Sequence, residues 1–160
     1  MTFMTDTHRA DQPVPSAEAG LSGFAPAPKR LRNVGGRAVT FEGEELGMAM
    51  SYTPELPYWF EINIYRASDG SFPVAIKQFF VSEDRRDIHR AWVAPTVDAA
   101  IDGIEQFDPA HDVPVPDGIL QAELSAAEME AVAMELHAKV ADVRTHYRSL
   151  VGEFLHAIDA

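Results

Sequence analysis

Hydrophobic and polar residues alternate in two neighbouring stretches of the chain, residues 59–65 and 72–79. Such alternation is typical of β-strands that bury one face. Ser68, Asp69 and Gly70 lie between the stretches and are suited to a three-residue hairpin loop with glycine in the left-handed position. This loop predicts four cross-strand pairs: Ile64 with Val74, Ile62 with Ile76, Glu61 with Lys77, and Trp59 with Phe79. A shift of one residue would mix the two faces, so the pattern favours this register.

Three further stretches with strand character flank the hairpin, residues 38–41, 46–52 and 88–93. Gly43 and the two glutamates after it are expected to turn the chain between the first two strands. Consecutive strands with short connections favour an antiparallel meander. We therefore expect an antiparallel sheet of about five strands over residues 37–94.

Two segments after the sheet follow the periodicity of helices. Residues 96–107 begin with Thr96, which is suited to cap a helix N-terminus. The second segment, residues 125–158, begins with Ser125 and Glu128 at the spacing of a capping box. Apolar residues then recur at three- and four-residue steps: Met129, Val132, Leu136, Val140, Val143, Tyr147, Leu150, Phe154 and Ile158.

The second helix is long for a chain of this size. Unbroken, it would extend roughly 50 Å, whereas a compact domain of this length is only about 30–35 Å across. Either Gly152 interrupts the helix, or part of the apolar stripe extends beyond the sheet. An overhanging stripe needs a partner, and a homodimer through this helix is the simplest one.

The first 33 residues lack apolar periodicity and are rich in proline, alanine and glycine. This composition predicts a disordered N-terminal arm. Residues 34–160 are expected to form a single α+β domain: the antiparallel sheet, the helix at 96–107 and the long amphipathic C-terminal helix at 125–158.

Composition excludes several classes of protein. The 160 residues include 46% hydrophobic residues and no cysteine, so disulfides and thiolate metal sites are ruled out. No apolar run approaches the roughly 18 residues of a membrane span, and no secretory signal is visible at the N-terminus. These features favour a cytoplasmic protein, and we expect no cofactor.

Charge is unevenly distributed along the chain, whose formal net charge is −12. Residues 91–138 contain ten acidic residues and no lysine or arginine. Asp98, Asp102 and Glu105 lie in the predicted first helix. Such a surface repels nucleic acid and favours a partner with a basic surface, which an acidic inhibitor would engage by imitating nucleic acid. A solvated face that aids solubility is the plainer interpretation.

A small basic cluster occupies residues 29–37 and includes Lys29, Arg30, Arg32 and Arg37. Binding of nucleic acid through this part of the arm is one alternative function. The cluster is also compatible with the solvated edge of a linker.

Two pairs of residues raise the possibility of a catalytic or metal site. Glu153 and His156 have the spacing used in di-iron helical bundles, but those bundles need a second such pair and two more carboxylates. If the strand at 88–93 lies beside residues 79–81, Glu61 and His89 meet across the sheet as an acid–base pair. The main rival hypothesis is therefore an enzyme or ligand-binding domain with these two residues in a pocket between sheet and helices.

One face of the predicted hairpin carries aromatic residues together with charged ones: Trp59, Tyr65 and Phe79 with Glu61 and Lys77. Aromatic residues on a sheet can stack with bases, but the acidic chain opposes that function. We expect the C-terminal helix to cover this face. The alternative is that the face binds another protein, because Trp and Tyr are favoured at interfaces.

These observations favour a small non-enzymatic protein-interaction or regulatory protein. The candidate interaction residues belong to the aromatic face, the acidic segment and the helical stripe: Trp59, Glu61, Tyr65, Lys77, Phe79, Asp98, Asp102, Glu105, Tyr147 and Phe154.

Overall fold

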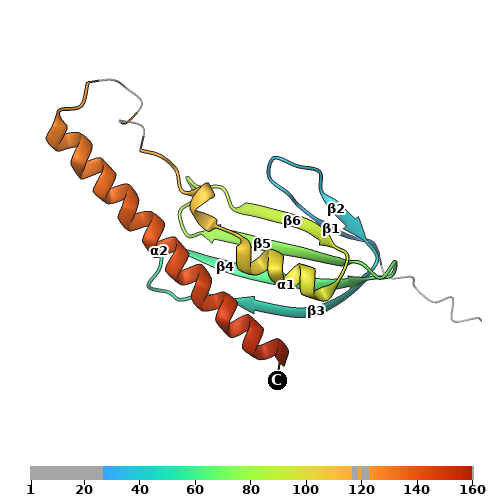
Figure 1. Ribbon diagram of the computed structural model, residues 1–160. Coiled ribbons are helices and arrows are strands. Elements are labelled where there is room, and N and C mark those ends of the chain that lie inside the picture. The colour runs from blue at the N-terminus through green and yellow to red at the C-terminus, as the bar shows by residue number, and fades with distance from the viewer. Residues whose placement is uncertain (1–26, 117–118, 120–122, 160) are drawn as a thin grey trace, which may run out of the picture.

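The computed structural model of the protein describes residues 27–116, 119 and 123–159 (Figure 1). Its elements in chain order are β1 (Lys29–Leu31), β2 (Val39–Phe41), β3 (Gly43–Met50), β4 (Tyr58–Ala67), β5 (Phe72–Phe80), β6 (Ile88–Ala94), α1 (Val97–Gln106), the 3-10 turn η1 (Pro109–Asp112) and α2 (Ala126–Asp159). The fold is α+β, as predicted. Sheet and helices follow one another along the chain and form two layers (Figure 1).

Strands β3 to β6 form an antiparallel sheet in sequential order, which is the predicted meander. The predicted register of β4 against β5 is confirmed at every proposed pair. The backbone N–H of Ala67 donates to the carbonyl of Ser71 at 2.9 Å and closes the three-residue loop. Gly70 has a φ of 85°, the left-handed conformation that the loop requires.

The meander contains four strands, because the first predicted strand belongs to a separate hairpin. This strand, β2, pairs with β1 in a two-stranded ribbon. The arm predicted over residues 1–33 lies mostly outside the described residues, but for Lys29–Leu31 the prediction of disorder was wrong. Leu31 is buried against the sheet, and Gly35 turns the chain with a φ of 76°. Leu31 of β1 packs with Val39 and Phe41 of β2 against the sheet, and this burial stabilises the ribbon. Strand β1 is too short for its periodicity to be recognised in the sequence.

Both helices pack on one face of the sheet, which we call the helical face (Figure 1). Its central side chains are at most 2% exposed: Phe60, Ile62, Ile64, Val74 and Ile76. α1 approaches the sheet closely at Gly103, where an added β-carbon would lie 2.9 Å from the ring of Trp92. Gly103 lowers the helix propensity of this segment, but a larger residue at this position would clash with Trp92.

The C-terminal helix α2 is continuous through Gly152, so the alternative in which this glycine interrupts the helix is wrong. Its N-terminus has the predicted capping box, in which the N–H of Ser125 donates to the Glu128 carboxylate at 2.8 Å. At 1.5 Å per residue the helix is about 50 Å long. Its C-terminal half packs on the sheet, and its N-terminal half extends past the sheet edge (Figure 1). Among the described residues, neither helix has the length and apolar character needed to cross a membrane.

Candidate functional site

Within the part of the chain that the structure describes, the second face of the sheet is covered at one end only. There the β1–β2 ribbon lies over Tyr65, Ala75 and Ala91, and Leu31 completes this small core. Tyr65 is 7% exposed and contacts the ring of Phe41 at a centroid distance of 5.1 Å. Tyr65 is therefore a core residue of the ribbon interface, and its prediction as an interaction residue was wrong.

The remainder of this second face carries a row of rings that runs from Tyr52, just after β3, across β4 and β5 to β6. Trp59 stacks on Phe79 with ring centroids 5.2 Å apart, and Tyr52 meets Trp59 edge-on at 5.2 Å. At the other end, His89 meets Phe79 edge-on at 6.0 Å. The rings thus contact one another with the offset and edge-to-face geometry that aromatic pairs prefer. This packing makes the row rigid.

Strand β3 extends the row with methionines. Met48 and Met50 pair across the ladder with Asn63 and Glu61, so they point to the same side as the rings. Met48 is 50% exposed, Met50 is 48% exposed, and Tyr52 is 56% exposed. Alternation at 46–52 predicts that these residues share a face, but not which face the helices leave open.

We call this uncovered surface the open face and define it by the following residues: Met48, Met50, Tyr52, Trp59, Glu61, Lys77, Phe79 and His89. In its centre the Lys77 ammonium donates to the Glu61 carboxylate at 2.6 Å, and both side chains are about one-fifth exposed. Lys77 also lies opposite His89 in the ladder. Burial, followed by the charges of Lys77 and Arg32, lowers the pKa of His89. The face therefore combines apolar rings and thioethers with a compensated ion pair.

The prediction that the C-terminal helix covers Trp59 and Phe79 was wrong. α2 packs on the opposite face, where it buries Tyr147 and Phe154 to 2% and 1% exposure. Tyr147 and Phe154 are therefore core residues and are not available to a partner. The periodicity of a long helix shows its apolar stripe but does not show which residues of the stripe reach the sheet, so the sequence alone leaves Tyr147 and Phe154 as candidates.

A hollow of about 400 Å³ lies where the open face meets the β1 strand, and we call it the basic groove. Its lining includes the cationic residues Lys29, Arg30, Arg32 and Lys77 together with His89, and it includes no aspartate or glutamate. Its remaining lining residues are Leu31, Tyr65 and Ala75. Ion pairs between the described residues do not involve Lys29, Arg30 or Arg32. The fold thus concentrates uncompensated positive charge beside the open face of an acidic chain.

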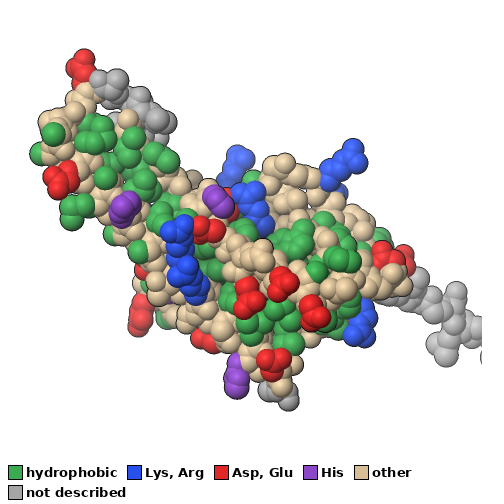
Figure 2. Space-filling model, viewed as in Figure 1, with side chains coloured by type: hydrophobic (Ala, Val, Ile, Leu, Met, Phe, Trp, Pro, Cys, Tyr) green, Lys and Arg blue, Asp and Glu red, His purple; other side chains and the backbone are tan. Residues whose placement is uncertain are grey.

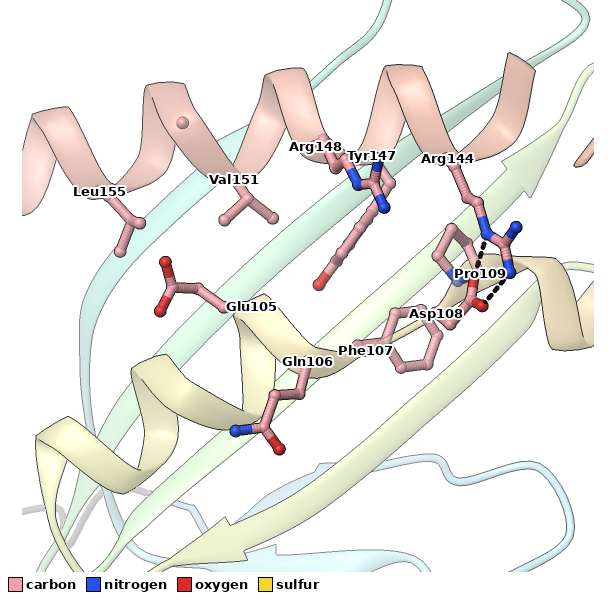
Figure 3. A pocket seen from close by; sticks show the side chains of 11 residues that line it. Glu105, Gln106, Phe107, Asp108, Pro109, Arg144, Tyr147, Arg148, Val151 and Leu155 are labelled. Carbon is pink, nitrogen blue, oxygen red and sulfur yellow. Dashed lines mark hydrogen bonds and ion pairs between the residues drawn. The ribbon is translucent and has the colours of Figure 1, made fainter. Parts of the chain in front are cut away.

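The predicted acidic surface is partly neutralised in the structure. Asp98, Asp102 and Glu105 are exposed on α1, as the helical pattern predicts (Figure 2). Asp108 instead accepts from Arg144, whose Nε lies 2.9 Å from one carboxylate oxygen (Figure 3). Asp112 pairs with Arg90.

The hydrogen bonds from Arg144 hold the pKa of Asp108 at about 2. Since two of the acidic residues in this segment anchor η1 to its neighbours, they serve packing as much as surface charge.

A second hollow, of about 500 Å³, lies between α1, η1 and α2 (Figure 3). Its ion pair joins Arg144 to Asp108, and the hydroxyl of Tyr147 donates to the carbonyl of Ile104 at 2.7 Å. Glu105 and Arg148 contribute the other charged side chains. Three of its polar side chains, Asp108, Arg144 and Tyr147, already have partners within the protein, and their hydrogen bonds tie α1 and η1 to α2.

Glu61 and His89 do not lie in a pocket between sheet and helices. Both belong to the open face, and the ammonium of Lys77 occupies the ladder position between them. Among the described residues, no group of three or more histidine, aspartate or glutamate side chains has the geometry of a metal site. The geometry therefore gives no support to the acid–base pair of the rival hypothesis.

One cluster of titratable residues is not evident in the sequence. The hydroxyl of Tyr58 donates to Asp142 at 2.6 Å and lies 2.9 Å from Nδ1 of His146. Burial and the Asp142 carboxylate raise the pKa of Tyr58. The cluster fastens β4 to α2, and the separation of 84 residues between Tyr58 and Asp142 hides it from sequence patterns.

Comparison with known proteins adds no family to these observations. No protein-family model, curated protein or solved structure matches the chain.

Proposed function

We propose that the chain is a protein-interaction module that binds its partner through the open face. The observation that carries the proposal is a row of apolar side chains left exposed on an ordered sheet, with Met48, Met50 and Tyr52 each about half exposed. Aromatic residues and methionine are enriched at protein interfaces. A rigid ring row loses little conformational entropy on binding, and the adjacent methionines adapt their shape to a partner.

The ring geometry favours a protein over nucleic acid as the partner. Trp59 and Phe79 stack on each other, and Tyr52 and His89 meet them edge-on. Their ring faces are thus largely engaged, whereas base stacking requires free faces. The net charge of −12 also opposes approach of a long polyanion.

Site-specific photocrosslinking in the cells that make the protein tests this proposal. A benzophenone amino acid replaces Tyr52 on the open face in one variant and Asp102 on exposed α1 in a control. We expect a discrete adduct with a second protein at position 52 and none at position 102. Absence of an adduct at 52, or the same adducts at both positions, would contradict the proposal.

The overhanging half of α2 supports a second candidate function, self-association. Met129 is 43% exposed and Met134 is 68% exposed there. Figure 2 shows hydrophobic side chains on the surface of this half of the helix. Only Met129 belongs to the apolar stripe, so Met134 provides a matched control. If two copies pair along the stripe, light scattering gives twice the chain mass of 17.6 kDa. Met129→Glu would then yield the monomer, and Met134→Glu would keep the dimer. A monomer for the unaltered chain at about 100 µM would contradict self-association.

A further inference from the structure

Strand β1 presents an unpaired edge to the basic groove. Among the described residues it pairs with β2 alone, and its three residues line the groove, whereas the lining of the groove includes none of the residues of β2. A strand edge carries backbone N–H and carbonyl groups that can pair with another extended chain. The groove therefore offers hydrogen bonds from a backbone as well as positive charge.

Charge in the groove selects an anionic partner. Three of its cations, Lys29, Arg30 and Arg32, are exposed and lack a carboxylate within 4.0 Å among the described residues. Lys77 retains Glu61, so the net charge of the lining and its nearest partner remains positive. The groove is therefore positive although the chain as a whole is negative. The net charge predicts a basic partner, whereas the groove favours an acidic one.

We propose that the basic groove binds an extended acidic peptide segment of the partner by strand addition to β1. The segment's backbone would pair with the free edge of β1. Its carboxylates would meet Arg30 and Arg32, which share one face of the extended chain, and its alternate side chains would lie on the face of Lys29. This inference rests on the proposed function, because it names the chemistry of the partner that the open face binds.

Backbone pairing distinguishes a peptide from a phosphate ligand. A free strand edge alternates donors with acceptors, and its carbonyls repel a phosphate while they accept hydrogen bonds from a peptide. The cations also suit an extended peptide, because Arg30 and Arg32 are exposed and lie two residues apart, the spacing at which an extended chain places side chains on one face. Nucleic acid is therefore the disfavoured ligand, and its binding becomes a negative outcome of the test.

Fluorescence anisotropy with labelled probes tests the inference on the full chain. The probe is an eight-residue peptide of alternating glutamate and valine, compared with its lysine–valine counterpart and with a dodecamer of thymidine. We expect binding of the acidic peptide at low salt, and weakening by about tenfold when salt is raised from 20 to 200 mM. Tighter binding of the basic peptide or of the DNA would overturn the inference.

Matched charge reversals locate the site. Arg32→Glu in the groove should weaken the acidic probe by about tenfold or more, whereas Arg148→Glu, the same charge change on α2, should alter it less than about twofold. Both residues are exposed, so circular dichroism is expected to show an unchanged fold. Equal effects of the two reversals would show that net charge, and not the groove, controls binding.

A modified probe separates strand addition from simple charge attraction. Methylation of alternate backbone nitrogens removes donors without a change of charge and should weaken binding about tenfold. Equal affinity of the methylated and unmethylated probes would overturn strand addition. If no acidic probe binds while crosslinking at position 52 still succeeds, the groove inference fails and the proposed function stands.

Discussion

The two faces of the sheet differ in what covers them: both helices pack on the helical face, and neither packs on the open face. Strand β4 places Phe60, Ile62 and Ile64 on the helical face, and the residues between them on the other side. The first set lies under two helices, whereas Trp59 and Glu61 remain on the open face. Large aromatic rings on a sheet face are therefore not sufficient for a helix to pack on it. The polar residues among the rings also determine whether the face is covered.

Desolvation explains the difference. A helix over the open face would bury the Glu61–Lys77 ion pair, and the removal of two charges from water costs several kcal/mol per ion before their attraction is recovered. Asn63, which is 3% exposed beside that pair, already has an amide oxygen without a hydrogen-bond partner among the described residues. The uniformly apolar face carries no such penalty, so the helices pack there.

Substitutions at neighbouring ladder positions on the two faces should have the largest contrast in stability. Ile62→Ala on the helical face leaves a cavity under the helices and should lower the free energy of unfolding by about 2–5 kcal/mol. Met50→Ala on the open face, where the side chain is 48% exposed, should change it by less than about 0.5 kcal/mol. Urea denaturation followed by circular dichroism measures both values. Similar losses for the two variants would mean that the open face is also a core.

Alkaline titration sharpens the comparison at the covered end of the second face. Burial, with the charge of Glu45, raises the pKa of Tyr65 to about 12, whereas an unfolded tyrosine ionises near pH 10. The unfolded state therefore loses its proton first, and stability falls as pH rises from about 10 to about 12.

This residue contributes at most about 1.4 kcal/mol of that loss per pH unit. Tyr65→Phe should flatten the dependence of unfolding free energy on pH across this range, as measured by urea titrations at several pH values. An unaltered slope would show that Tyr65 is solvated, and that the β1–β2 ribbon does not cover it.

The smallest effect concerns the ion pair that holds η1 on the helical side. Arg144 keeps the pKa of Asp108 at about 2, below its ordinary value near 4, so the pair stabilises the fold at neutral pH and loses its effect as pH falls through about 2. The Arg144 and Asp108 side chains are 42% and 31% exposed, so Asp108→Asn should lower stability by less than about 1 kcal/mol at pH 7. The difference from the unaltered chain should shrink towards zero near pH 2, in the same urea assay. A difference that persists at that pH would assign the loss to packing.

Sequence periodicity predicts the elements that are long or closed by a local loop. The β4–β5 register follows from alternation and from Gly70, and the start of α2 follows from Ser125 and Glu128. These signals come from residues that are close together in the chain, so a single sequence is enough to reveal them.

Contacts between distant segments are harder to predict. The three-residue strand β1 is too short for a periodic pattern, and its pairing depends on Leu31 reaching the sheet. The basic groove likewise joins residues 29–32 to Lys77 and His89, which only the fold brings together. For this reason the sequence predicts the aromatic residues of the candidate site, but it does not predict that the basic residues lie beside them.

Oxidation of methionine by hydrogen peroxide tests the central claim most directly, because the open face carries Met48 and Met50. Mass spectrometry compares their rates of sulfoxide formation in the purified chain and inside the cells that make it. We predict rapid oxidation of both in the purified chain and marked protection in cells, where the partner is present. Protection that already exists in the purified chain, or equal rates in both settings, would contradict the claim that this face is left open for another protein.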